Sequence, residues 1–89
     1  MQEAQDINQE LARCLDAGLR ADAPEVQDAV DRHYKWVCAS WTPDAGSYVG
    51  LGRMYVEDPR FTAFYDKNRA GLARFLFEGI QAYAAYRLT

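Results

Sequence analysis

Apolar residues recur at helical spacing along this chain of 89 residues, and no segment alternates apolar and polar residues as a half-buried strand does. The clearest stripe is Ile7, Leu11, Leu15 and Leu19, which lie four residues apart between polar positions. Because an α-helix has 3.6 residues per turn, this spacing places all four on one face. The sequence therefore predicts an all-α fold that opens with an amphipathic helix from Glu3 to about Arg20.

Local start and stop signals divide the rest of the chain. Asp22 or Ala23 can cap a helix, and Pro24 suits its first turn. Asp58 followed by a proline gives the same kind of start, and residues 42–47 have the Pro, Asp, Gly and Ser content of a loop. The predicted further helices run from Pro24 to about Ser40, from Ser47 to Val56, from Asp58 to about Lys67 and from about Ala70 to Arg87.

Two glycines interrupt the predicted helix over residues 47–56. Gly50 and Gly52 each cost a helix about 1 kcal/mol relative to alanine. That cost indicates either the close approach of another backbone or room left for a ligand.

All twelve aromatic residues lie between Tyr34 and Tyr86. Tyrosine and tryptophan combine a large apolar surface with one polar group, which suits both a core and a pocket for bulky organic molecules. We expect Phe61, Phe75, Leu76 and Ile80 to lie in the core, with Phe64 and Tyr65 also available for burial. The remaining rings near the two glycines would then line a cleft.

Charge and cysteine content exclude several classes of protein. The net charge is −3, and residues 1–45 alone carry nine acids against four bases, which does not suit a nucleic-acid surface. No apolar run is long enough for a membrane span or a signal segment. Cys14 and Cys38 are too few for a disulfide framework. We therefore expect a soluble, cytoplasmic protein with reduced thiols and no membrane contact.

No constellation of residues provides an anchor for catalysis. His33 is the only histidine, and on an apolar helix face it is expected to be a hydrogen-bonded structural residue. Cys14 and Cys38 are expected to be small buried hydrophobes, and Asp58 to be a helix cap rather than an acid/base group. The sequence contains no phosphate-binding glycine loop, Ser-His-Asp set or metal-ligand spacing. It predicts no enzyme, no cofactor and no metal; haem or thiol chemistry through His33 or Cys38 remains an alternative.

Three segments carry a resemblance to a known family. They are Tyr34-Lys-Trp-Val-Cys-Ala-Ser-Trp-Thr-Pro43, then Met-Tyr-x-x-Asp-x-Arg-Phe over residues 54–61, then Gly71-Leu-Ala. From about Val26 to Tyr86 the chain resembles the TipA-type antibiotic-recognition domain (TipAS) found at the C-terminus of MerR-family transcription activators. The first 20 residues match only as an amphipathic helix.

The resemblance implies an all-α, globin-like arrangement of about five helices whose cleft binds bulky hydrophobic antibiotics. In whole regulators of this family, a separate N-terminal domain contacts DNA and a coiled coil makes a homodimer. We therefore expect residues 1–89 to form a single ligand-binding domain, with a helix over 1–20 and a motif-bearing core over 24–89. It would be shorter than the family domain at its N-terminal side, carry no DNA-binding domain and be a monomer.

One departure from the family affects the mechanism. In the best-known family type, a cysteine directly before the Leu-Gly-x-Met-Tyr string captures the dehydroalanine of a thiopeptide. Here that position is Gly50, which has no nucleophile. The resemblance therefore implies reversible, noncovalent binding.

We thus expect a ligand-sensing domain that binds bulky aromatic compounds between the second helix and the helix over residues 47–56. The alternative is a protein interaction module with an exposed aromatic patch and no small ligand. The predicted binding residues are Trp41, Tyr48, Leu51 and Tyr55 in the cleft, with His33, Tyr34 and Trp36 nearby.

Overall fold

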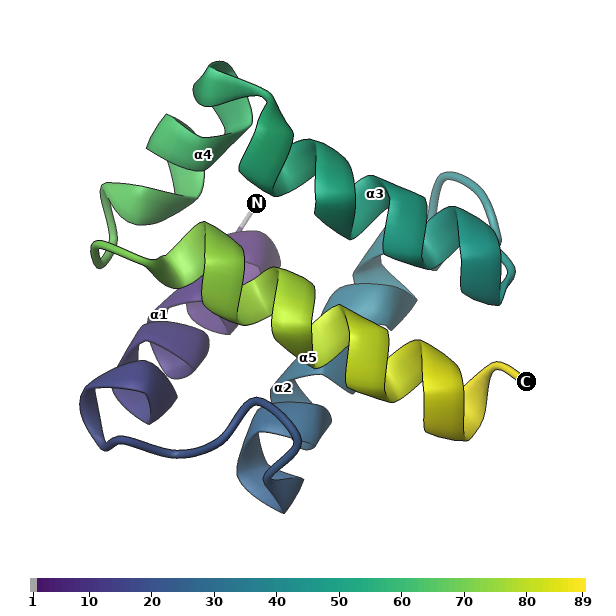
Figure 1. The fold of residues 1–89 in the computed structure, drawn as a ribbon, viewed down its shortest axis with the longest axis horizontal. Coiled ribbons are helices and arrows are strands. Elements are labelled where there is room, and N and C mark those ends of the chain that lie inside the picture. Colours follow the sequence, from purple (N-terminus) through teal and green to yellow (C-terminus); the bar gives the residue numbers. More distant parts are fainter. Residues whose placement is uncertain (1) are drawn as a thin grey trace.

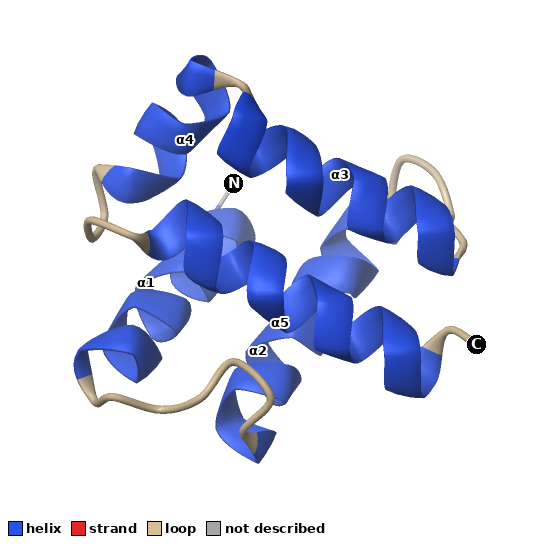
Figure 2. Cartoon of the chain, in the orientation of Figure 1, coloured by secondary structure: helices blue, strands red, loops and turns tan. Residues whose placement is uncertain are grey.

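Residues 2–89, which the computed structural model describes, form five helices joined by short loops, and no strand occurs among them (Figures 1 and 2). The all-α prediction is confirmed. None of these helices is long and apolar enough to cross a bilayer. The helices are α1 (Gln2–Asp16), α2 (Pro24–Cys38), α3 (Ala45–Glu57), α4 (Pro59–Asp66) and α5 (Leu72–Arg87).

Helix α1 ends four residues before the predicted boundary at Arg20, because Gly18 has a φ of +76° and terminates it. The Gly18 amide donates to the Leu15 carbonyl, and the Leu19 amide donates to the Cys14 carbonyl, as in a Schellman motif. Leu19 therefore lies in the loop after the helix rather than on its stripe. The stripe itself is confirmed for Ile7 and Leu11, which are buried.

Capping residues set the starts of the helices, and one start, that of α3, differs from the prediction. The Asp58 carboxylate accepts from the Arg60 amide at 3.0 Å and begins α4 as predicted. Helix α3 begins at Ala45, two residues earlier than predicted, because the Asp44 carboxylate accepts from the Ser47 amide at 2.8 Å. Ala23 occupies the cap position of α2, whereas Asp22 pairs with Arg20.

Helices α3 and α5 run antiparallel beside each other, and α1 and α2 lie behind α5 (Figure 1). Gly52 permits this approach: a Cβ built there would lie 2.9 Å from Cδ1 of Phe77 and 3.1 Å from Cδ1 of Ile80. Side chains of α5, and not the backbone expected from the sequence, therefore make the close approach at Gly52. A Cβ built at Gly50 would have no neighbouring atom within 4 Å, so close packing does not account for that glycine.

One continuous core draws side chains from all five helices, including Phe75, Leu76 and Ile80 as predicted. The predictions for two phenylalanines of α4 are wrong. Phe61 is only half-buried against the core, and the side chain of Phe64 is 48% exposed. The reason is that α4 has only eight residues and turns a single side chain, Tyr65, fully into the core.

Candidate functional site

An aromatic groove runs along α2, α3 and α4. It consists of two adjoining hollows, one of about 300 Å³ between α2 and α3 and one of about 550 Å³ among α2, α3 and α4. Trp36 and Tyr55 line both hollows and so join them. The other large side chains of this aromatic groove are Trp41 and Leu51 in the first hollow and Arg60, Phe61, Phe64 and Tyr65 in the second.

The walls of the aromatic groove are exposed to solvent although they are aromatic. Trp36 is 44% and Trp41 is 48% exposed, which is a large apolar area for two residues five positions apart. Tyr55 forms the floor and is only 4% exposed, with its ring packed 4.7 Å from that of Tyr65. The groove therefore combines a rigid, buried floor with walls that a ligand could cover.

The floor is fixed by a buried hydrogen-bond network around His33. The His33 Nδ1 lies 2.7 Å from the Tyr48 hydroxyl, which in turn lies 3.4 Å from the Val30 carbonyl. All partners are satisfied if Nδ1–H donates to Tyr48, Tyr48 donates to Val30, and the Tyr55 hydroxyl donates weakly to Nε2 across 3.5 Å. His33 is thus the hydrogen-bonded structural residue that its position suggested.

Burial keeps this network uncharged. It lowers the pKa of His33 to about 4, because the interior disfavours the imidazolium. The same desolvation raises the pKa values of Tyr48 and Tyr55 above their ordinary range. At neutral pH the floor therefore presents neutral rings, and no general base or nucleophile lies in it.

The structure brings four of the seven predicted residues to the groove surface: Trp36, Trp41, Leu51 and Tyr55. The other three lie underneath or beside it. Tyr48 has no exposed surface, so in this structure it supports the floor and does not line the groove, contrary to its predicted place there. Tyr34 is half-buried because its hydroxyl donates to the Pro43 carbonyl at 2.8 Å.

The reasoning from sequence missed the part of the groove that α4 contributes. Phe61 and Phe64 sit three residues apart and were assigned to burial, although a short helix after a proline start offers little core-facing length. Arg60 is the only charged residue in the groove, and its guanidinium pairs with Asp58 at 2.9 Å. The spacing of Phe61, Phe64 and Tyr65 in an eight-residue helix that can turn few side chains inward could have indicated this second wall.

Neither cysteine nor Gly50 places a nucleophile in the groove. Cys14 is buried, and desolvation raises the pKa of its thiol. Cys38 is half-buried and does not line either hollow. Gly50 lines a separate hollow together with Arg53 and Met54, and it lines neither hollow of the groove. Among the described residues, no three His, Cys, Asp or Glu side chains gather as a metal site requires.

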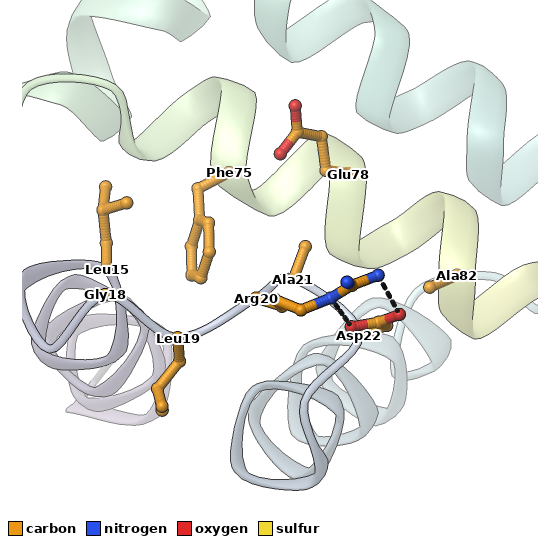
Figure 3. A pocket seen from close by; sticks show the side chains of 9 residues that line it. All are labelled: Leu15, Gly18, Leu19, Arg20, Ala21, Asp22, Phe75, Glu78 and Ala82. Carbon is orange, nitrogen blue, oxygen red and sulfur yellow. Dashed lines mark hydrogen bonds and ion pairs between the residues drawn. The ribbon is translucent and has the colours of Figure 1, made fainter.

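Another hollow lies between the loop after α1 and α5 (Figure 3). Its volume is about 610 Å³, but an ion pair between Arg20 and Asp22 closes one side of it at 3.0 Å. Glu78 lies on the opposite side, and Phe75 is 5% exposed. Three charged side chains, Arg20, Asp22 and Glu78, line this hollow, whereas aromatic rings dominate the lining of the aromatic groove, so the aromatic groove is the better candidate.

The chain is similar to two transcription regulators over most of its length. The chain is 39% identical over 90 residues to the HTH-type transcriptional regulator SkgA of Caulobacter vibrioides, covering 97% of this chain and 34% of that protein. It is 33% identical over 84 residues to the HTH-type transcriptional activator TipA of Streptomyces coelicolor, covering 92% of this chain and 33% of the activator. The chain therefore spans about a third of the length of these relatives, which are transcription regulators and not enzymes.

A solved structure shares the fold. The Streptomyces lividans thiopeptide resistance protein TipAS, in complex with nosiheptide, superimposes with a TM-score of 0.90 at 29% identity. The match covers 99% of this chain and 62% of that one. The family model of the TipAS antibiotic-recognition domain matches residues 1–83, so the expectation that the likeness begins near Val26 is too narrow. This chain belongs to the TipAS antibiotic-recognition domain family.

Proposed function

We propose that the aromatic groove binds bulky, flat and largely apolar compounds reversibly. The observation that carries this proposal is the half-exposed pair Trp36 and Trp41, held above the buried ring of Tyr55. Covering on the order of 100 Å² of one indole contributes about 2.5 kcal/mol at 25 cal/mol per Å². Two tryptophans are enough to supply most of the binding energy of such a site, since a few aromatic residues usually do so.

The wider role rests on the relatives. SkgA and TipA are HTH-type transcription regulators, and the TipAS structure holds nosiheptide. We infer that this domain senses a compound of that bulky class for a regulator whose DNA contacts are made by a separate domain. Binding would favour one conformation of the domain and so shift the equilibrium between the conformations of the whole regulator.

The experiment is a calorimetric titration with nosiheptide of the wild type, Trp36→Ala and Trp41→Ala. Tyr86→Ala is the matched control, because Tyr86 is 81% exposed and lines neither groove hollow. We expect each tryptophan variant to weaken binding on the order of tenfold to a hundredfold and the control to bind as the wild type. If both tryptophan variants retain full affinity, the groove is not the binding site.

A second candidate function follows from the same surface. Trp36, Trp41 and Phe64 of the groove are all more than a third exposed, and such a patch can dock another protein instead of a small ligand. Sedimentation over a range of protein concentrations without ligand separates the two. Self-association that Trp36→Ala abolishes would favour the interaction module, whereas a concentration-independent monomer argues against self-association.

A further inference from the structure

Asn8 is a polar residue in an apolar position. It lies on the core side of α1 next to Ile7, and the residue is 5% exposed. Its side chain forms no hydrogen bond with any residue that the structure describes, unlike Gln27, whose amide donates to two carbonyls. Among the described residues that are not exposed, every side-chain nitrogen or oxygen that is closed off from solvent has a hydrogen-bond partner. The Asn8 amide therefore still reaches open space.

That space is a small inner pocket of about 90 Å³. Besides Asn8 it is lined by Ala4 and Ile7 of α1, His33 and Trp36 of α2, and Phe64 and Tyr65 of α4. Trp36, Phe64 and Tyr65 also line the larger hollow of the aromatic groove, so the inner pocket is its extension toward α1. The volume exceeds that of one water many times over, since a water needs about 10–15 Å³, but it cannot hold a whole drug.

An asparagine here is costly unless something binds it. Asparagine is a weak helix former, and an amide that faces a small inner pocket has fewer hydrogen-bond partners there than in bulk water unless a ligand supplies them. A leucine would fit the apolar stripe of α1 and remove both costs. Residues that suit neither their helix nor their apolar surroundings are expected at functional sites.

The walls define what the inner pocket can accept. Four of its lining side chains are flat rings, and no Asp, Glu, Lys or Arg lines it. His33 is uncharged, with both ring nitrogens already engaged by Tyr48 and Tyr55. The Asn8 amide offers one acceptor and two donor hydrogens. A charged group would lose its hydration without gaining a counterion, whereas a neutral planar group would stack and hydrogen-bond.

We propose that the inner pocket is a subsite for a neutral, planar, hydrogen-bonding group of the ligand, such as a primary amide or a heteroaromatic ring, held by the Asn8 amide. This deepens the function proposed above and rests on it. The bulky body of the ligand lies in the aromatic groove against Trp36, and the small polar group passes between Trp36 and Phe64 to reach α1.

The test uses three small probes that differ in one group: benzamide, toluene and benzoate. Each is titrated into the protein by proton-nitrogen NMR, with the Asn8 side-chain amide and the Trp36 indole as reporters. We expect benzamide to bind about five- to tenfold more tightly than toluene, the ratio of one net hydrogen bond, and benzoate to bind least. Equal affinity of benzamide and toluene, or no saturable shift at Asn8, would mean that the pocket holds only solvent and overturns the proposal.

Variants separate the hydrogen bond from pocket shape. Asn8→Ala enlarges the pocket and Asn8→Leu fills it, and both should abolish the preference for benzamide over toluene. Gln9→Leu removes an amide from the exposed side of the same helix and should preserve it. A preference that survives both Asn8 variants overturns the subsite. If nosiheptide binding depends on Trp36 but benzamide is not preferred over toluene, the proposed subsite is wrong and the proposed function stands. If benzamide is preferred but nosiheptide does not bind, the pocket accepts the planar group and the proposed binding of bulky compounds is wrong.

Discussion

At the scale of single residues, His33 couples the groove floor to pH. In the native state its pKa is about 4, against 6.5 for an ordinary imidazole. Between these values the unfolded chain binds a proton that the native state does not, so stability falls as pH falls from about 6.5 to about 4. The free energy of unfolding should fall by on the order of 3 kcal/mol across this pH range.

Urea unfolding at several pH values across that window measures this effect. His33 is the only histidine, so His33→Gln should remove the slope whatever its own stability. The carboxylates with lowered pKa values, such as Asp31 beside Tyr83 and Lys35, lose their contribution at still lower pH. An equal slope in wild type and variant would place the titrating group elsewhere.

Gly50 supports a second residue-scale prediction. With glycine at this position, and with Cys38 outside both groove hollows, nosiheptide should leave no covalent adduct. Intact-mass spectrometry after incubation and denaturation should give the unmodified mass. A mass increase that Cys38→Ser abolishes would show that the half-buried thiol reaches the ligand, contrary to this expectation.

At the scale of elements, the two glycines of α3 should respond in opposite ways to alanine. Gly52→Ala places a Cβ 2.9 Å from Phe77, in the packed contact with α5, and should destabilise the protein by about 1–3 kcal/mol. Gly50→Ala meets no atom within 4 Å and should stabilise α3 by about 0.5–1 kcal/mol. Thermal unfolding of the pair checks this, and a stable Gly52→Ala variant would contradict the close packing of α3 on α5.

At the scale of the whole molecule, ligand binding and stability are linked. All five helices contribute to one core, so a ligand on the groove should raise the stability of the entire domain. At a free ligand concentration of 100 times Kd the gain is about 2.7 kcal/mol, which for a domain of this size raises Tm by on the order of 10 °C. Scanning calorimetry with nosiheptide measures it. Trp36→Ala should lose most of the shift; an undiminished shift in that variant would place the ligand elsewhere.

Much of this protein follows from local chemistry. The helix class, the apolar stripe of α1 and the cap at Asp58 depend on residues within a few positions of one another, so the sequence by itself determined them. Several boundaries moved by two to four residues because a nearby glycine or aspartate, at Gly18 or Asp44, gave a stronger signal than the apolar pattern.

Tertiary structure alone decided which rings are covered. Tyr48 and Trp41 have similar side chains and lie in the same region of the sequence, yet one is fully buried and the other is 48% exposed. The difference arises because Tyr48 faces His33 and Tyr83 across the core, whereas Trp41 lies beyond the end of α2. Likewise, nothing in the α1 sequence marks Asn8 for burial; the packing of α1 against α2 encloses it. Exposure depends on contacts between distant segments, which periodicity and capping do not encode.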